Sequence, residues 1–286
     1  MTDDGFPGQT GQRPDGTVFT DAGEGHPVVL IHGIGLRLDI WEAQVAELRK
    51  AFRVICYDLY GHGRTPEVAG ECSLALYSAQ LRALLDGLKI DRAAIVGFSL
   101  GGLIGIDFTL REPERVSSLA VLHCAFRRAR SERDLIMSRV RTAEKNGPGS
   151  VVGLALDRWF TPAFAKRHPE TLARVAQWMR ANAHRPYADA YHLVAMGDLE
   201  VADELHRIAC PALVMTGADD RGNSPGMAMR MAELMQDGRC VILPGLRHMA
   251  LMEDPPAVTA PLERFLRDVA DGERMPRAAA ANRASS

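Results

Sequence analysis

The sequence predicts an α/β fold, in which a doubly wound and mostly parallel sheet carries a helical cap inserted between two of its strands. Apolar runs of strand length recur along the chain and are nearly continuous, as expected of strands buried on both faces. Segments of helix length separate the first four runs, which gives the β-α-β-α order of a parallel sheet covered by helices on both sides. This order stops after Cys124 and resumes at Pro211. We therefore expect the intervening segment to form the cap.

The individual elements follow from these runs. The predicted strands span residues 27–32, 53–58, 93–98, 118–124, 212–216 and 239–243. The predicted helices of the sheet span residues 40–50, 74–88, 103–111, 227–235 and 257–269. The inserted stretch is rich in Arg, Ala, Leu and His with helix-like spacing. We expect a core of residues 16–125 and 210–272, a helical cap of residues 126–209, and mobile, polar or low-complexity tails at residues 1–15 and 273–286.

Composition and charge disfavour several classes of protein. The chain has 286 residues, of which 47% are hydrophobic, and this is enough to build a large core. Its 34 Lys and Arg residues balance 36 Asp and Glu residues, so it lacks the basic field that holds a nucleic-acid backbone. No apolar run reaches the roughly eighteen residues of a membrane-spanning helix, and no basic segment leads into an apolar one at the N-terminus. We expect a cytoplasmic protein without nucleic-acid or membrane partners, and the sequence does not indicate its oligomeric state.

The potential metal ligands give no cofactor signal. Five cysteines are an odd number and form no C-x-x-C pair, so we expect reduced and mostly buried thiols. No cluster of His, Cys, Asp or Glu has the spacing of metal ligands. We expect neither a metal ion nor another cofactor.

A serine motif indicates a nucleophile. The segment Gly97-Phe98-Ser99-Leu100-Gly101 matches G-x-S-x-G, and it lies where a predicted strand turns into a helix. In such a turn the hydroxyl projects above the sheet, and small residues on either side let the strand and the helix approach. Serine is a weak nucleophile at neutral pH, so a histidine must accept its proton and a carboxylate must orient that histidine. Ser99 is therefore the candidate nucleophile.

The candidate base and acid follow later strands. His248 lies in the loop after the predicted strand 239–243, at the sheet edge where parallel sheets place their sites. The preceding strand leads through Gly217 to Asp219 and Asp220, of which only one can face the histidine. We select Asp220, three residues beyond the glycine, and expect Asp219 to be solvated or to cap the next helix.

Two backbone amides are candidates for an oxyanion hole. The first core strand ends in Ile31-His32-Gly33-Ile34-Gly35, whose glycines allow backbone N–H groups to turn inward. We expect the amides of Ile34 and Leu100 to be the donors, and we expect His32 to orient the loop without transferring protons. The same segment lacks the third glycine of G-x-G-x-x-G, which disfavours a dinucleotide site.

Over residues 17–270 the chain resembles the α/β-hydrolase superfamily. The order Ser99, Asp220, His248 is the order of that family's triad, and residues 58–65 (D-L-Y-G-H-G-R-T) are similar to its D-x-x-G-H-G-x-S turn. Residues 32–41 (H-G-I-G-L-R-L-D-I-W), 158–162 (R-W-F-T-P) and 248–255 (H-M-A-L-M-E-D-P) resemble the 3-oxoadipate enol-lactonase branch. The resemblance implies the α/β-hydrolase fold and a structural role for His62. The acid loop, residues 220–225 (D-R-G-N-S-P), departs from the D-P-x-T-P-P-like pattern of that branch and leaves the substrate open.

The cap is expected to lie over Ser99, because it leaves and rejoins the sheet at the edge formed by the carboxyl ends of the strands. Six cap residues are candidates to line a substrate pocket, although each could instead pack the cap onto the sheet: Arg158, Trp159, Phe160, Tyr191, His192 and Met196. Arg158 could bind a substrate carboxylate, as an enol-lactone acid requires, or it could be solvated.

Three functions remain open at this point. The first is a serine hydrolase that opens a small carboxylic ester or an (enol-)lactone: Ser99 forms an acyl-enzyme, His248 transfers the proton and Asp220 stabilises the imidazolium. The second uses the same residues to hydrolyse a carbon–carbon bond of a vinylogous diketone. The third is a ligand receptor on the hydrolase fold with slow turnover. The expected partner of the first is a small-molecule ester or lactone.

Overall fold

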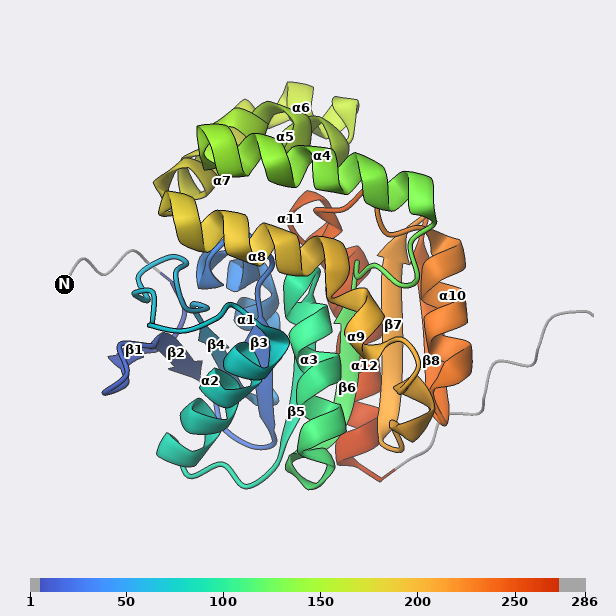
Figure 1. Cartoon of the computed structure of the whole chain (residues 1–286). Helices are drawn as coiled ribbons and strands as arrows, with labels where there is room; N and C mark the ends of the chain where they lie inside the picture. Colours follow the sequence, from blue (N-terminus) through green and yellow to red (C-terminus); the bar gives the residue numbers. More distant parts are fainter. Residues whose placement is uncertain (1–5, 273–286) are drawn as a thin grey trace, which may run out of the picture.

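The computed structural model describes residues 6–272, which form a single sheet of eight strands with helices on both faces (Figure 1). The strand order is β1-β2-β4-β3-β5-β6-β7-β8. Strand β2 pairs antiparallel with β1 and with β4, whereas all other pairs are parallel. The predicted doubly wound, mostly parallel sheet is confirmed. The strands are β1 (Gln9–Gln12), β2 (Val18–Ala22), β3 (Pro27–Ile31), β4 (Arg53–Tyr57), β5 (Ala93–Phe98), β6 (Val116–Leu122), β7 (Pro211–Gly217) and β8 (Asp237–Leu243).

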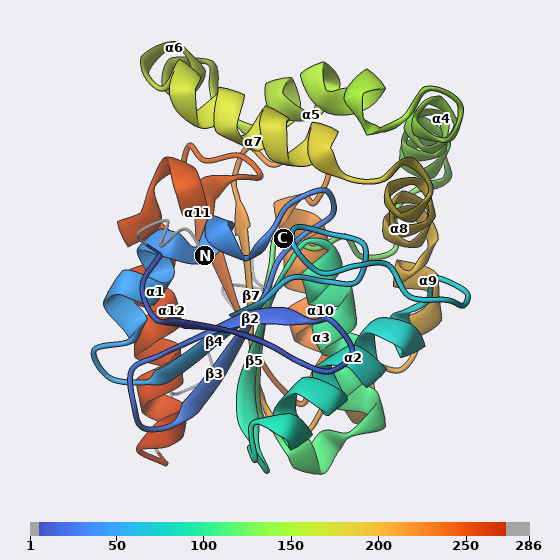
Figure 2. The same cartoon turned by 90° about the vertical axis from the view of Figure 1, so that its left-hand side faces the viewer.

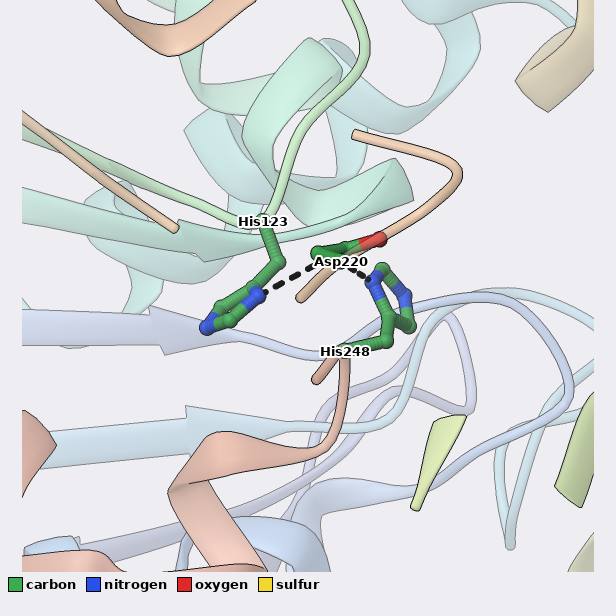
Figure 3. Close-up of side chains that lie close together, drawn as sticks. All are labelled: His123, Asp220 and His248. Atoms are coloured by element: carbon green, nitrogen blue, oxygen red, sulfur yellow. Dashed lines mark hydrogen bonds and ion pairs between the residues drawn. The ribbon is translucent and has the colours of Figure 1, made fainter. Parts of the chain in front are cut away.

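The central strands are apolar because both of their faces are covered. Every residue of β5 and β6 is buried, which accounts for their unbroken apolar runs. Strand β6 ends at Leu122, two residues earlier than expected, because His123 adopts a positive φ of 50° that turns the chain out of the sheet. This turn places the side chain of His123 beside Asp220 (Figure 3).

Two layers of helices cover the sheet (Figure 2). Helices α1 (Glu42–Leu48) and α12 (Pro255–Ala270) pack together on one face, and α2 (Leu74–Gly87), α3 (Leu100–Arg111) and α10 (Pro225–Leu234) lie on the other. The short helix α11 (Ala250–Glu253) precedes α12. Four 3-10 turns complete the connections, at Leu38–Trp41, Pro113–Arg115, Pro148–Val151 and Leu205–Arg207. The two layers bury the central strands on both sides, as the sequence predicts.

The cap lies over the carboxyl ends of the parallel strands (Figure 1). The chain enters it after β6 and returns to the sheet at β7. Within it, α4 packs on α8 and α5 packs on α7. Its helices are α4 (Arg130–Asn146), α5 (Val152–Trp159), α6 (Pro162–Arg167), α7 (Pro169–Ala181), α8 (His184–Met196) and α9 (Asp198–Val201). The inserted helices therefore form a separate layer above the sheet edge.

The N-terminal segment differs from its prediction. Residues 9–12 were expected in a mobile tail, but they form β1 and pair in register with β2, from Gln9 opposite Asp21 to Gln12 opposite Val18. Their polar sequence gives no apolar signal, because an edge strand needs only backbone hydrogen bonds and one covered side. Phe19 supplies that cover, since its ring occupies the space where a Cβ at Gly11 would stand. The expected tail is therefore wrong for this segment.

The remaining tail predictions concern residues 1–5 and 273–286, which lie outside the described residues. Within residues 6–272, no helix combines the length and the apolar character that crossing a membrane requires. The five cysteines are free; Cys56 and Cys124 are buried and the other three are half-buried.

Candidate active site

Ser99 stands at the sharp turn between β5 and α3. Its backbone has φ 55° and ψ −113°, a combination that costs a residue with a side chain about 1–3 kcal/mol. Two backbone hydrogen bonds of 2.9 Å hold the turn, from Ser99 N–H to Leu122 O and from Gly102 N–H to Ser99 O. Ser99 remains partly exposed between buried neighbours. The strained turn thus presents its hydroxyl at the sheet edge beneath the cap.

Gly97 and Gly101 make this turn possible. A Cβ at Gly97 would lie 2.0 Å from the carbonyl oxygen of Gly101, and a Cβ at Gly101 would lie 2.3 Å from that of Ile31. Neither position admits a side chain without moving the backbone. This is the close approach of strand and helix that the G-x-S-x-G pattern predicts.

Asp220 and His248 lie in the loops that follow β7 and β8. The Nδ1 of His248 is 2.8 Å from Oδ2 of Asp220, and both side chains are buried. Asp219 is exposed, and its backbone N–H donates to Leu246 O at 3.0 Å. It does not cap the next helix, since Ser224 is the residue before α10. Asp220 is therefore the carboxylate that orients His248.

The Asp220 carboxylate is held by hydrogen bonds on both oxygens. Its Oδ1 accepts from the backbone N–H groups of Gly222 at 3.0 Å and Asn223 at 3.1 Å, and its Oδ2 faces His248. Burial raises the pKa of Asp220, but the electrostatic interaction with His248 and the hydrogen bonds from the imidazoles of His123 and His248 outweigh this effect. The pKa therefore lies far below its ordinary value. Asp220 is ionised at neutral pH.

His123 is a third member of this cluster, which the sequence interpretation missed (Figure 3). Its Nδ1 lies 3.1 Å from the same Oδ2 of Asp220, and the ring is completely buried. Burial lowers the pKa of His123, so the ring is neutral. A histidine directly after a buried strand, at the edge that carries the serine and the aspartate, was the available signal.

His123, Asp220 and His248 also offer three ligand atoms within 4.8 Å of one another, and no other group of three such side chains among residues 6–272 does so. Both imidazole Nδ1 atoms face one carboxylate oxygen at 2.8 and 3.1 Å. These are ordinary N–H···O distances. In this cluster the two imidazoles are thus arranged as donors to one oxygen of the Asp220 carboxylate.

The loop after β3 lies against Ser99. A Cβ on Gly33 would stand 3.1 Å from the Cβ of Ser99, so the next residue, Ile34, borders the nucleophile. Leu100 is the first residue of α3 and its amide is one of the unpaired N–H groups of a helix start. In the described part of the chain, the amides of Ile34 and Leu100 donate no hydrogen bond. Both are therefore free to bind an oxyanion.

Two other buried histidines hold the loops of this edge together. His32 accepts from Leu59 N–H at 3.0 Å through Nε2 and donates through Nδ1 to Gly33 O at 2.8 Å. Burial lowers the pKa of His32 to about 4 and that of His62 to about 3, so both are neutral at physiological pH. In the turn that carries His62, Asp58 accepts from the backbone of Leu38 at 2.7 Å. These contacts are structural.

Comparison with known proteins agrees with this geometry. A family model described as the alpha/beta hydrolase family matches residues 28–262. The chain belongs to the alpha/beta hydrolase family. Among curated relatives of this hydrolase, (E)-2-((N-methylformamido)methylene)succinate hydrolase of Acinetobacter baylyi is 30% identical over 248 residues, which are 87% of this chain and 93% of the relative. The 3-oxoadipate enol-lactonase 2 of the same species is 28% identical over 242 residues, 83% of this chain and 89% of the relative.

Solved structures give the same result. The crystal structure of the enol-lactonase from Burkholderia xenovorans superposes on this hydrolase with a TM-score of 0.80 and 28% identity, and the match covers 88% of this chain and 98% of that one. These similarities confirm the predicted resemblance to the α/β-hydrolases and to their enol-lactonase branch.

A cavity of about 220 Å³ lies between the sheet edge of this hydrolase and its cap. Ser99, Ile34 and His248 line its floor, and α4, α5 and α8 line its roof. The indole of Trp159 stands 5.7 Å from the His248 ring, centroid to centroid. The loop of His248 is also bound to the end of α5, because Met249 N–H donates to Trp159 O at 2.9 Å. This hydrogen bond fixes the loop of the candidate base relative to the cap.

Three of the six predicted cap residues line this cavity, namely Arg158, Trp159 and Tyr191. The other three do not. Phe160 packs the cap internally by stacking on Phe164, with the rings 5.4 Å apart. His192 is exposed, since the face of α8 toward the cavity carries Tyr187, Tyr191 and Val194 at helical spacing. Met196 lies beside Arg133, with its sulfur 4.0 Å from a guanidinium nitrogen.

The cavity wall is positively charged, which the sequence predicts only at Arg158. Arg128, in the loop before α4, and Arg139, in the middle of α4, also line it. Arg128 donates to Val194 O at 2.8 Å and lies 4.0 Å from Asp198, so its charge is partly balanced. The Nε of Arg139 is buried and finds no hydrogen-bond partner in the described part of the chain. Burial, together with the charge of Arg158, lowers the pKa of Arg139. The arrangement can bind an anion above Ser99.

Proposed function

We propose that this hydrolase opens small carboxylic esters or lactones through an acyl-enzyme on Ser99. One observation carries the proposal: Ser99 and His248 line the same cavity, and the buried Asp220 carboxylate holds His248 at Nδ1. With His248 oriented by Asp220 and accepting the proton of Ser99, the weakly nucleophilic serine hydroxyl can attack a carbonyl carbon. Ser99 Oγ and His248 form no hydrogen bond within residues 6–272, and such contacts commonly tighten only when substrate binds.

The reaction proceeds in two halves. Ser99 Oγ bonds to the carbonyl carbon while its proton moves to His248 Nε2, and the amides of Ile34 and Leu100 donate to the oxyanion. Collapse of the intermediate breaks the bond to the leaving oxygen, which takes the proton from His248. In a lactone the leaving oxygen stays on the acyl chain. Water then attacks the acyl-enzyme by the same steps and releases the acid and Ser99.

The charge of the cap supports a substrate with a free carboxylate. Arg139 and Arg158 border the cavity, and neither has a carboxylate partner among the described residues. A guanidinium binds a carboxylate through paired, charge-assisted hydrogen bonds. The two curated relatives are named for a succinate derivative and for the enol-lactone of 3-oxoadipate, and both names denote carboxylic acids. The proposed substrate is thus an ester or lactone that keeps at least one ionised carboxyl group.

A substrate screen tests this proposal. Wild-type enzyme and Ser99→Ala are assayed against neutral short esters, monoesters of dicarboxylic acids, lactones and enol-lactones. We expect multiple turnover on a carboxylate-bearing ester or lactone, with a loss of about 10⁴ or more in kcat for the variant. Activity of Ser99→Ala within tenfold of wild type would refute the serine mechanism.

Two other outcomes would assign a different function. Release of an enol-ketone from a dienoic acid, without ester or lactone hydrolysis, would indicate that the same residues hydrolyse a carbon–carbon bond. Binding of a ligand without multiple turnover of any acyl compound would indicate a receptor.

A further inference from the structure

We propose that His123 is a positioning residue for the hydrolytic reaction, which acts by holding the Asp220 carboxylate against His248. This inference rests on the proposed serine mechanism. It concerns a residue that no sequence motif includes. Three observations carry it: the geometry of the shared carboxylate oxygen, the protonation that the surroundings impose on His123, and the cost of burying this ring.

The shared oxygen is held from two sides. In Figure 3 the rings of His123 and His248 reach Asp220 from opposite sides, and both Nδ1 atoms face Oδ2, at 3.1 and 2.8 Å. The other oxygen is occupied by two backbone N–H groups of the same loop. With both oxygens fixed, the carboxylate cannot rotate about its own axis. His123 supplies the one donor to Oδ2 that is independent of the catalytic histidine and of the acid loop.

The tautomer of His123 follows from its surroundings. The ring is completely buried and burial lowers its pKa, so it is neutral and carries one proton. With that proton on Nε2, the lone pair of Nδ1 would point at an anionic oxygen 3.1 Å away, and the Nε2–H would have no acceptor. With the proton on Nδ1, the ring donates to Asp220. His123 is therefore an Nδ1–H donor.

The unfavourable burial of the His123 ring indicates that its imidazole is needed for a specific contact. Nε2 of His123 is buried and has no hydrogen-bond partner among residues 6–272, and a buried polar atom in that state costs stability. An apolar side chain at the end of β6 would avoid the cost. The ring packs against Phe98, with centroids 5.7 Å apart, a contact that an apolar residue could also make. The hydrogen bond to Asp220 is the contact that specifically needs an imidazole.

For catalysis, the His123 donor fixes the position of the Asp220 carboxylate and reduces the negative charge on its Oδ2. A second donor on Oδ2 withdraws negative charge from the oxygen that faces Nδ1 of His248. Besides Asp220, the charged side chains among residues 6–272 that line the cavity together with His248 are Arg128, Arg139, Arg158, Arg221 and Glu132. Loss of the His123 donor should therefore leave more negative charge on Oδ2 of Asp220 and misplace the His248 ring.

Matched variants of His123 test the proposal. His123→Asn keeps an N–H donor near the Nδ1 position, whereas His123→Leu has the same branched shape without a donor. We expect His123→Leu to lose about 10- to 100-fold in kcat/KM, the effect of one hydrogen bond to a charged group. Its acidic limb of kcat/KM should move to higher pH. His123→Asn should recover most of the activity and return the limb toward its wild-type position.

A second buried histidine provides the control. His62→Leu also removes a buried imidazole whose Nε2 has no partner within the described residues, but His62 does not border the cavity. We expect this variant to lower Tm without moving the acidic limb. If His123→Leu keeps the wild-type pH profile, or if the Asn and Leu variants are equally impaired with an unmoved limb, the positioning role is wrong.

Histidine NMR separates failure of this inference from failure of the proposed function. With ¹⁵N-labelled histidine, we expect His123 to be a neutral Nδ1–H ring across neutral pH, with a hydrogen-bonded proton that shifts in Asp220→Asn. If wild-type enzyme hydrolyses no ester or lactone, the proposed function fails, and with it the catalytic role of His123. If wild-type enzyme is active but His123 is an Nε2–H tautomer, this inference alone fails.

Discussion

Replacing Asp220 by asparagine should abolish most of the activity, because it stabilises the His248 tautomer that carries its proton on Nε2. Oδ1 of Asp220 accepts from the backbone N–H groups of Gly222 and Asn223, at 3.0 and 3.1 Å. An asparagine must keep its carbonyl oxygen there, because an amide NH₂ would face two donors. The NH₂ group then occupies the Oδ2 position, 2.8 Å from Nδ1 of His248, and donates to it. The histidine proton moves to Nε2.

The size of the effect follows from that tautomer. A His248 protonated on Nε2 cannot accept the proton of Ser99. Regaining the active form would set an N–H group of His248 against the NH₂ of the asparagine. A comparable substitution in a serine protease triad lowers kcat about 10⁴-fold, and a loss of this size corresponds to about 5 kcal/mol in activation free energy.

The neighbouring carboxylate provides the matched control. Asp219 is exposed, and Asp219→Asn should leave kcat within about threefold of wild type, because surface changes away from a site have small effects. The assay is kcat on a saturating ester, with Tm of all three proteins measured in parallel to show that they are folded. If Asp219→Asn abolishes activity while Asp220→Asn remains active, the tautomer reasoning and the choice of carboxylate are both wrong.

Two further substitutions test the cavity and the buried histidines. Arg139→Met should raise KM for a carboxylate-bearing ester about 10- to 100-fold and leave a neutral ester unchanged, whereas Arg141→Met, at an exposed position of the same helix, should change neither. Equal losses on both esters would contradict an anion site. His62→Leu should reduce the dependence of the unfolding free energy on pH in acid. Burial lowers the pKa of His62 to about 3 in the folded state, against 6.5 in the unfolded state. Below pH 6.5 the unfolded state therefore binds more protons than the folded state. Wild-type stability should therefore fall by up to about 1.4 kcal/mol per pH unit from this residue as pH drops below 6.5. Urea unfolding at pH 7 and pH 5 measures this, and an unchanged pH slope in the variant would contradict it.

Much of the sheet could be predicted from the sequence because its strands are buried on both faces and read as unbroken apolar runs. The prediction fails where that signal is absent. Strand β1 is an edge strand of Gln, Thr and Gly, held by backbone pairing to β2 and covered by Phe19. Periodicity also misses the end of β6, because a single residue, His123, sets it through a positive φ.

The site residues also differ in how far the sequence predicts them. Ser99, Asp220 and His248 each follow a recognisable strand, so chain order alone brings them to one edge of the sheet. The cap residues depend on how helices rotate against each other. Consecutive residues of α8 therefore differ, with Tyr191 on the cavity and His192 in solvent. His123 belongs to no motif, and only the folded sheet shows that it shares a carboxylate oxygen with His248.

Covalent labelling tests the central claim, a nucleophilic Ser99, most directly. In an organophosphonate ester the phosphorus takes the place of the carbonyl carbon, and attack by the serine oxygen expels its leaving group and leaves a phosphonyl–serine bond. Mass spectrometry of wild-type enzyme should show one phosphonyl group per chain on the peptide that contains Ser99. Ser99→Ala should show none, and His248→Ala should react far more slowly. Burial raises the pKa of Cys124 to about 12, so no thiol adduct is expected there. A label on Cys124, or equal labelling of wild type and Ser99→Ala, would contradict the serine mechanism.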